Sequence, residues 1–400
     1  MKKILRDNKG SISALVVISV LLYSIVLTTV FMQASSKRKM QMESQILAKE
    51  AYEKQLDNLD EIRDEVIGLP RTNETQPYYP SREFKQVKET NLDNGLVIED
   101  GNGNQYVWVE VPKNTTVYPT AGLNITNFTD DEYTKIENDL HTYTSVYRNG
   151  TGRKDTWVAD NNNTGWFTES EYYAQKKTML KSVYQNGGFY VGRYEAGIDT
   201  TTGTNRTSKG PTNSDGKYTI EGMSTPLSKA DAYPYTYVTR TQAQNLASNV
   251  NSGTKTSSLM FGVQWDLVLA FMSKDTAKIT STDVLTKDST TIGNYRNSTF
   301  DLNRGKYAQY DQLGNEWKNF DSALDSIVVS NETTGKMKKT EQSSYENGIL
   351  LTTGGTEQSK VMNIYDIAGN VWEWTLEKTD RGSLPCAQRG GDFYDTGSGS

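Results

Sequence analysis

Two carboxylates stand in one short aromatic block near the C-terminal end of the sequence, YDIAGNVWEW at residues 365–374. Asp366 and Glu373 can meet in one loop, where main-chain carbonyls add further oxygen ligands. Oxygen ligands of these two kinds suit hard cations, above all calcium. Gly369 lies between them and permits a tight turn. We therefore predict a structural calcium site. The alternative is that Asp366 caps a helix and Glu373 makes ordinary hydrogen bonds.

Two residue types that often carry catalysis are almost absent. The sequence has one histidine, His141, and one cysteine, Cys386. A single cysteine excludes an intramolecular disulfide framework and a zinc site built on several thiolates. A single histidine disfavours Ser-His-Asp hydrolysis and multi-histidine metal chemistry. His141 stands in a polar run typical of a loop or a helix end. These residues favour a protein without catalytic residues and leave open whether it is an enzyme.

The composition indicates a domain with many loops and a modest core. Apolar residues make up 35% of the 400 residues, a low share, and the chain has 24 tyrosines. The body of the chain is also rich in Asn, Thr, Ser and Gly, a mixture suited to adaptable recognition. The net charge of -6 argues against a nucleic-acid partner, which would need a basic surface.

An apolar run at residues 12–33 predicts a transmembrane helix. At 1.5 Å per residue, a run of this length spans about 30 Å, the hydrocarbon thickness of a bilayer. Basic residues flank the run with a slight excess before it, which favours a cytoplasmic tail at residues 1–11 and an extracytoplasmic domain. A cleaved secretory signal is the alternative, but its apolar region is normally shorter. We expect a single-pass protein of the cell membrane.

Two further features surround this run. Gly10, followed by a small residue and an apolar helix, is similar to the start of a type IV prepilin, although Leu15 stands where prepilins usually carry Glu. Residues 34–67 predict a helical stalk, because apolar residues recur there at helical spacing without Gly or Pro. The stalk either packs as a surface helix or associates with another copy. Residues 68–84 are rich in proline and predict a linker.

Residues 85–400 predict one α+β domain. Alternating apolar residues and a Gly-rich turn predict a pair of strands at residues 96–98 and 106–111, and a further strand is predicted at 189–195. Helices are predicted at residues 169–184, 239–250 and 263–272, whereas residues 273–360 carry few strong signals.

Several of these segments, in this order, resemble the formylglycine-generating enzyme (sulfatase-modifying factor) family. The block at 365–374 is the most specific, and the others are YVWV at 106–109, GFYVGRYE at 188–195, PYTYV at 234–238, QWD at 264–266 and RGG at 389–391. The resemblance covers about residues 85–400 and implies a C-type-lectin-like fold. It also implies calcium ligands at Asp366, at the carbonyls of Gly369 and Val371, and at Glu373.

The catalytic part of that family does not carry over. Its enzymes use a pair of cysteines shortly after the glycine turn to bind copper and activate oxygen. Asp395 and Ser400 stand at those positions here, and Cys386 precedes the turn as a buried or incidental thiol. Carboxylate and hydroxyl groups do not replace two thiolates around copper, so we expect no copper. The iron-dependent sulfoxide-synthase relatives need several histidines, which this sequence lacks.

The resemblance further implies an Arg-rich stretch and a closing strand after the position of Ser400. The domain is therefore expected to be C-terminally incomplete in this sequence, to borrow a strand, or to leave a sheet edge open. Since the terminal strands pair in lectin-like folds, we expect the strand at residues 106–111 to lack a partner.

These features predict a membrane-anchored extracellular binding or display protein with a non-catalytic formylglycine-generating-enzyme-like domain. Its surface ligand is open between carbohydrate, peptide and protein. Because domains of the family also serve as variable display proteins in diversity-generating retroelements, that role is one sub-hypothesis. Two alternatives stay open: a copper-dependent oxidase of the formylglycine-generating type, if cysteines lie beyond the end of this chain, and a minor pilin-like tip subunit.

Overall fold

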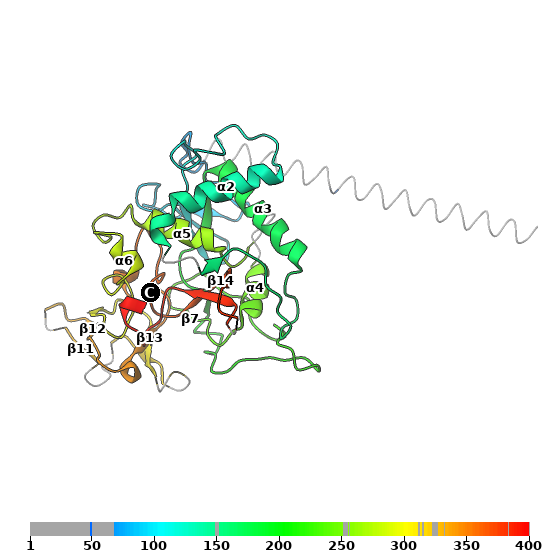
Figure 1. Ribbon diagram of the computed structural model, residues 1–400. Helices are drawn as coiled ribbons and strands as arrows, with labels where there is room; N and C mark the ends of the chain where they lie inside the picture. The colour runs from blue at the N-terminus through cyan, green and yellow to red at the C-terminus, as the bar shows by residue number, and fades with distance from the viewer. Residues whose placement is uncertain are drawn as a thin grey trace, which may run out of the picture. The chain divides into compact units, whose positions relative to one another are not determined.

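The computed structural model describes Lys49 and most of the chain from Gly68 onward (Figure 1). The predicted cytoplasmic tail, the transmembrane helix and Gly10 lie outside the described residues, as does the stalk apart from Lys49, which is helical. None of the helices in the described part of the chain is long and apolar enough to cross a membrane. The ranges described are 68–148, 152–250, 257–310, 316–321, 327–331, 333–382 and 384–399, with the single residues 49, 255 and 313.

Residues 68–84, predicted as a linker, belong to the same compact unit as the domain. Leu69 and Thr75 are buried. The Thr75 hydroxyl donates to the carbonyl of Gly187 at 2.9 Å and accepts from the indole N–H of Trp108 at 2.8 Å. These contacts attach the proline-rich segment to the first sheet of the domain.

A four-stranded antiparallel sheet begins the domain, in the order β1-β2-β3-β5. The predicted turn between β2 and β3 is confirmed, since the Asp100 carboxylate accepts from the N–H groups of Asn102 and Asn104 at 2.9 and 2.8 Å. β3 pairs on both sides, so the expectation that this strand lacks a partner is wrong. The strands are β1 (Lys85–Gln86), β2 (Val97–Glu99), β3 (Gln105–Glu110) and β5 (Gly188–Gly192).

Two long helices, α2 (Asp130–Tyr143) and α3 (Glu169–Asn186), pack on each other. α3 confirms the helix predicted from residue 169. It begins at a capping box in which Thr168 and Glu171 exchange hydrogen bonds, and it ends at Gly187 with a φ of 65°. An added Cβ at Gly187 would overlap the carbonyl oxygen of Glu74, so only glycine fits at this point.

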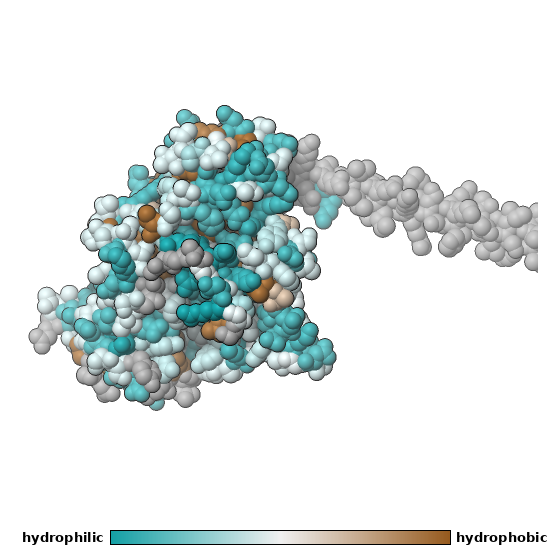
Figure 2. Space-filling view, viewed as in Figure 1, coloured by the Kyte–Doolittle hydropathy of each residue, from teal (hydrophilic) through white to brown (hydrophobic). Residues whose placement is uncertain are grey.

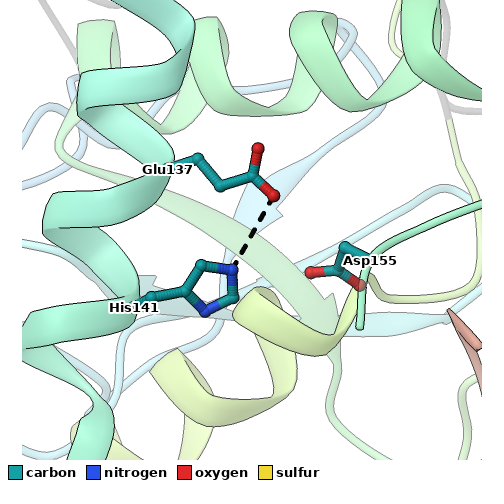
Figure 3. Close-up of side chains that lie close together, drawn as sticks. All are labelled: Glu137, His141 and Asp155. Carbon is teal, nitrogen blue, oxygen red and sulfur yellow. Dashed lines mark ion pairs between the residues drawn. The ribbon is translucent and has the colours of Figure 1, made fainter. Parts of the chain in front are cut away.

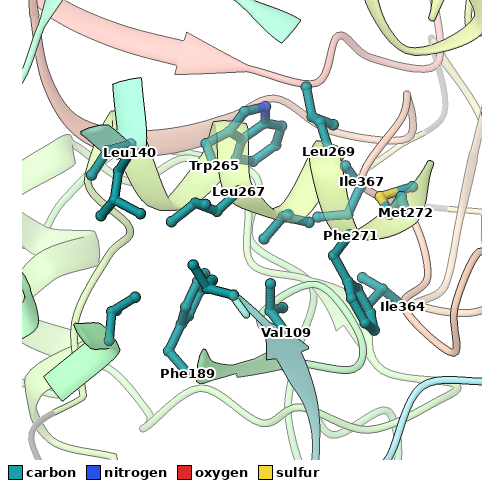
Figure 4. Packing of buried hydrophobic residues seen from close by; sticks show 14 of the residues in the cluster. Val109, Leu140, Phe189, Trp265, Leu267, Leu269, Phe271, Met272, Ile364 and Ile367 are labelled. Carbon is teal, nitrogen blue, oxygen red and sulfur yellow. The ribbon is translucent and has the colours of Figure 1, made fainter. Parts of the chain in front are cut away.

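Helix α5 (Gly262–Met272) forms the centre of the core and confirms the helix predicted at 263–272. Nearly all of its residues are buried, and a helix that is apolar on every face belongs inside a protein. Figure 4 shows its side chains packed toward Val109 of β3 and Phe189 of β5, with Ile364 and Ile367 at its C-terminal end. α4 (Arg240–Ser248) confirms the other helix predicted in this region.

The polar stretch at 273–360, which gave few signals, folds into short strands around a second apolar cluster. Two three-stranded sheets form there, β10-β9-β13 and β11-β12-β8. Their strands are too short to show a periodic pattern. The elements are α6 (Asp283–Thr286), β8 (Phe300–Asp301), β9 (Lys306–Gln309), β10 (Lys318–Asn319), β11 (Val328–Ser330), β12 (Met337–Lys339) and β13 (Ile349–Leu351).

A further sheet, in the order β15-β14-β4, carries the end of the 365–374 block. In Figure 1, β14 lies between the long helices at the top and strands β11, β12 and β13 at the lower left. The face in Figure 2 is mostly hydrophilic, with hydrophobic residues scattered over it. The domain thus mixes helices with several small sheets, and its likeness to C-type lectins stays a prediction. The remaining elements are β4 (Arg153–Lys154), β6 (Gly197–Ile198), β7 (Tyr233–Pro234), β14 (Glu373–Thr379), β15 (Cys386–Arg389) and the short 3₁₀ turns Ser145–Tyr147, Tyr345–Asn347, Glu357–Ser359 and Gly397–Gly399.

Candidate cation and ligand site

The loop that carries the predicted metal ligands is built from residues in left-handed backbone conformations. Asp366, Gly369 and Asn370 have φ angles of 60°, 72° and 64°. This confirms the tight turn predicted at Gly369, where an added Cβ would overlap the carbonyl oxygen of Asn294. The Asn370 side chain holds the loop, because its oxygen accepts from the N–H of Leu351 at 3.0 Å and from the amide of Asn294 at 2.9 Å. Such a conformation persists only where the surroundings fix it.

Asp366 is buried and holds neighbouring loops in place. One carboxylate oxygen accepts from the N–H of Gly354, and the other from the hydroxyl of Ser359, both at 2.6 Å. Burial raises the pKa of Asp366, and these two hydrogen bonds, with Arg304, oppose the rise. A carboxylate has about four lone-pair sites, so two hydrogen bonds leave Asp366 able to contact a cation as well.

Glu373 meets another carboxyl, that of Glu195. Both of its oxygens are closed to solvent, and apart from the bond that the two carboxyls form when one of them is protonated, no donor in the described part of the chain reaches them. Burial, with the like charges of Glu195 and Asp366, raises the pKa of Glu373 well above its usual value. A buried, unpaired carboxylate costs several kcal/mol unless it binds a proton or a cation.

Glu195 is a third carboxylate near Asp366 and Glu373, and we did not predict it from the sequence. Glu195 lies shortly after the end of β5. Its Oε2 accepts from the side-chain amide of Asn370 at 2.6 Å, and its Oε1 accepts from the backbone N–H of Val371 at 3.3 Å. Burial and the charge of Asp366 raise its pKa. The available signal was its place at the end of the GFYVGRYE segment, but one Glu after a strand does not indicate a ligand. We call Glu195, Asp366 and Glu373 the carboxylate cluster.

Glu195 and Glu373 are the two members of the carboxylate cluster whose side chains meet, because their carboxyls are within hydrogen-bonding reach of each other. Asp366 does not join them within 4.8 Å, since the described residues hold so close a triad only at Glu137, His141 and Asp155. Gly390 makes room for the Glu373 carboxylate: an added Cβ there would overlap Oε2 of Glu373 and would lie 2.9 Å from the carbonyl oxygen of Ile367. Carboxylate and carbonyl oxygens are the ligands that calcium prefers. The other two predicted ligands, the carbonyls of Gly369 and Val371, belong to the turn that precedes Glu373. That a cation binds here, and that it is calcium, stays a prediction.

A cavity of about 420 Å³ lies beside the carboxylate cluster, with Glu195 and Glu373 among its lining residues. Ala243 and Ala247 of α4 form part of its wall. Pockets of this size, mostly apolar with a few converging polar groups, are the usual form of a ligand site. Aromatic rings make up much of the lining, among them Tyr235, Tyr237, Tyr310, Trp372, Trp374 and Tyr394.

Tyr237 has a strained backbone. Its φ is 54°, and its side chain is 41% exposed. A bulky residue at positive φ is an outlier that persists only where its surroundings hold it, and such residues gather at binding and active sites. Arg206 supplies the support, because its guanidinium donates to the carbonyls of Thr236 and Tyr237 at 3.1 and 3.2 Å.

The two positions at which the predicted resemblance places cysteines hold Asp395 and Ser400. Asp395 lies in a turn, where its N–H donates to Asp392 at 3.1 Å, and Ser400 lies outside the described residues. Cys386 begins β15 and is partly buried. Burial raises the pKa of the Cys386 thiol, and Arg240 opposes the rise. A thiol with a raised pKa is a poor nucleophile and metal ligand. That Cys386 is a buried or incidental thiol stays a prediction.

A second acidic group lies apart from the block, at Glu137, His141 and Asp155 (Figure 3). Their ligand atoms lie within 4.8 Å of one another. His141 is in the last turn of α2, in agreement with the predicted helix end. Glu137 already pairs with Lys176 at 2.8 Å, and Asp155 accepts from two N–H groups at the start of α5. These partners give both carboxylates a structural role.

Comparisons with protein-family models, with curated proteins and with solved structures found no match for this chain. The resemblance to the formylglycine-generating enzyme family therefore stays a prediction.

Proposed function

We propose that the chain is a membrane-anchored extracytoplasmic protein whose formylglycine-generating-enzyme-like domain binds a ligand and is not catalytic. The observation that carries the proposal is the aromatic cavity beside the carboxylate cluster. Its wall includes Tyr237, whose backbone strain the protein maintains through Arg206. The described lining residues include neither His141 nor Cys386.

The proposed cation acts as a structural support for that site. Trp372 and Trp374 flank Glu373 in sequence, and both line the cavity. The indole N–H of Trp374 donates to the carbonyl of Val238 at 3.0 Å, which fixes the ring. A cation bound by Glu195 and Glu373 would join β14 to the end of β5 and hold these rings before the ligand arrives. Such preorganisation lowers the entropic cost of binding.

The binding proposal is tested by filling the cavity. Ala247 lines it, whereas Asn249, at the end of the same helix, is exposed and does not. We expect Ala247→Trp to lose at least tenfold in affinity for ligands selected by the purified full-length chain from peptide libraries and glycan arrays. Asn249→Trp, the matched control, should keep the affinity. Selected ligands that bind Ala247→Trp as tightly as the parent would contradict the proposal, as would a selection that yields none.

The proposed anchor is tested separately by mass spectrometry of the mature N-terminus in cells. A chain that begins at Met1 and stays in the membrane fraction is the expected result. A chain that begins at Ser11 would instead support the pilin-like tip subunit, because processing would then follow Gly10. Recovery of the chain in the soluble fraction would contradict both.

A further inference from the structure

Two exposed aromatic rings belong to the wall of the cavity. Tyr237 and Tyr310 are among its lining residues, yet 41% and 36% of these residues are exposed. Tyr237 precedes α4, and Tyr310 follows β9. Exposed apolar surface that gathers at a cavity is typical of a binding site. The cavity is therefore open to solution at these two rings and can receive a group carried on another molecule.

Three rings of the wall pack on one another and form what we call the aromatic corner: Tyr310, Phe393 and Tyr394. Tyr394 meets Tyr310 and Phe393 edge to face, with ring centroids 5.1 and 5.2 Å apart, and the centroids of Tyr310 and Phe393 lie 6.0 Å apart. Aromatic rings prefer such edge-to-face and offset contacts, which add to the gain from burying their area. The aromatic corner therefore offers a further ring the contacts that its own members make.

The polar ends of two other rings in the wall are already used within the protein. The indole N–H of Trp374 donates to the carbonyl of Val238 at 3.0 Å, and the hydroxyl of Tyr235 donates to the carbonyl of Ser224 at 2.8 Å. A carbohydrate would need free polar groups here, because each hydroxyl that it buries without a partner costs free energy. The wall therefore suits a ligand with few polar groups.

The charged side chains of the wall favour an ion of neither sign. Asp392 and Arg206 both line the cavity and carry opposite charges, and the Asp392 carboxylate accepts from the hydroxyl of Tyr394. Glu195 and Glu373 meet each other, so protonation or the proposed cation offsets their charge. A charged ligand would lose its hydration without gaining an unpaired partner, which is unfavourable. A neutral ligand avoids this cost.

We propose that the cavity binds the neutral aromatic side chain of a protein partner, as phenylalanine, tyrosine or tryptophan presents it. The inference rests on the proposed binding function and names the chemical class of its ligand. The ring packs against the aromatic corner. The opening at Tyr237 and Tyr310 lets the side chain enter while it stays attached to the partner's backbone.

The test uses the purified full-length chain in calcium-containing buffer and compares four probes by isothermal titration calorimetry. They are the Nα-acetyl methylamides of phenylalanine, cyclohexylalanine, lysine and glutamate. Cyclohexylalanine carries a saturated ring of similar size, so it matches the apolar area without an aromatic face. We expect the phenylalanine probe to bind at least threefold more tightly than the cyclohexylalanine probe, and at least tenfold more tightly than the two charged probes.

Two further measurements concern the charge and the source of the ring. Raising sodium chloride from about 0.1 to about 1 M should leave the affinity for the phenylalanine probe within twofold, because salt screens ion pairs and none forms here. An Nα-acetyl Gly-Phe-Gly amide should bind more tightly than free 2-phenylethanol. Tighter binding of 2-phenylethanol would overturn the protein partner in favour of a small aromatic compound.

Matched variants assign the effect to the cavity. Tyr310→Leu removes one ring of the aromatic corner, and we expect it to lose at least threefold in affinity for the phenylalanine probe and to lose the preference over cyclohexylalanine. Phe320→Leu alters an aromatic residue that is 37% exposed and does not line the cavity, so it should keep both. Circular dichroism and thermal unfolding confirm that each variant is folded.

Three results would overturn the inference and leave the proposed function standing. One is equal or tighter binding of the cyclohexylalanine, lysine or glutamate probe. Another is no binding of any probe by a chain whose library-selected ligands still depend on Ala247. The third is unchanged affinity for the phenylalanine probe in a folded Tyr310→Leu. Failure of the library selection itself, in contrast, counts against the binding function as a whole.

Discussion

Glu373 has the least usual environment of any carboxylate in the 365–374 block. Asp366 and Glu195 accept hydrogen bonds from N–H and hydroxyl donors, whereas Glu373 meets the carboxyl of Glu195, which bonds to it only when one of the two is protonated. Two states remove the cost of burying it: protonation, which its raised pKa favours, or binding of a cation. The two states predict opposite responses to added metal, so one substitution distinguishes them.

We expect Glu373→Gln to abolish stabilisation by calcium. In chelator, the variant should be at least as stable as the parent, because a neutral amide removes repulsion from Glu195. In calcium at about 100 times its Kd, the parent should gain about 2.7 kcal/mol and the variant almost nothing. Thermal unfolding with calcium and with chelator measures this. Glu357→Gln, which alters a carboxylate paired with Lys360, is the control and should respond as the parent does. A parent indifferent to calcium would remove the proposed metal site.

Among the secondary structure elements, helix α5 begins next to a buried network of ion pairs. Glu377 of β14 accepts from Arg148 and Arg389 at 2.9 Å. Asp155 accepts from the first two N–H groups of α5, at 2.6 and 3.0 Å, and so satisfies donors that a helix start leaves open. Gly262 is the first residue of α5, and an added Cβ there would overlap a carboxylate oxygen of Glu377. Helix α5 can therefore lie this close to strand β14 only because residue 262 is a glycine.

Gly262→Ala is accordingly expected to cost about 2 to 4 kcal/mol of unfolding free energy, because it displaces Glu377 from a buried pair. Urea unfolding followed by tryptophan fluorescence measures the loss. Gly382→Ala, at a position with open space around the Cβ, is the control and should change stability by less than about 0.5 kcal/mol. If the two variants were equally stable, the close approach of α5 and β14 would not be a constraint in solution.

For the molecule as a whole, two groups of buried carboxyls set opposite pH dependences. Burial and Glu377 raise the pKa of Asp155 to about 6, and burial and Asp395 do the same for Asp392. The folded state holds these protons more tightly than the unfolded chain, so their contribution to stability is lost as pH rises toward 6. Glu377 differs: its pKa is raised by burial but lowered overall by Arg389 and Arg148, so its contribution is lost as pH falls below the unfolded value.

Stability should therefore be greatest in mildly acid solution and decline between about pH 4.5 and 7, by about 1 to 3 kcal/mol for each raised carboxyl. Calcium should reduce this decline, because the ion binds the ionised forms of Glu195 and Glu373. Urea unfolding at a series of pH values, with calcium and with chelator, gives both curves. Stability that rises steadily from pH 4.5 to 7 in chelator would show that these acids are not buried as described.

Much of the local structure could be predicted from the sequence, because helices, turns and strand pairs depend on neighbouring residues. Helical spacing predicted α3, α4 and α5, and the Gly-rich turn predicted the pairing of β2 with β3. The block at 365–374 marked Asp366 and Glu373, and its glycine predicted the tight turn. The strands of residues 273–360 were missed because two- to four-residue strands carry no period to detect.

The tertiary structure alone decided which of these groups meet. Glu195 and Asn370 are 175 residues apart in sequence, yet a hydrogen bond joins them and brings Glu195 beside Glu373. The missing partner of β3 turned out to be β5, which reaches it only because α3 returns the chain across the domain. Burial, the meeting of the Glu373 and Glu195 carboxyls and the shape of the cavity depend on contacts between distant segments. The sequence determined the chemistry available in the 365–374 block, and only packing decided where a cation and a ligand could bind.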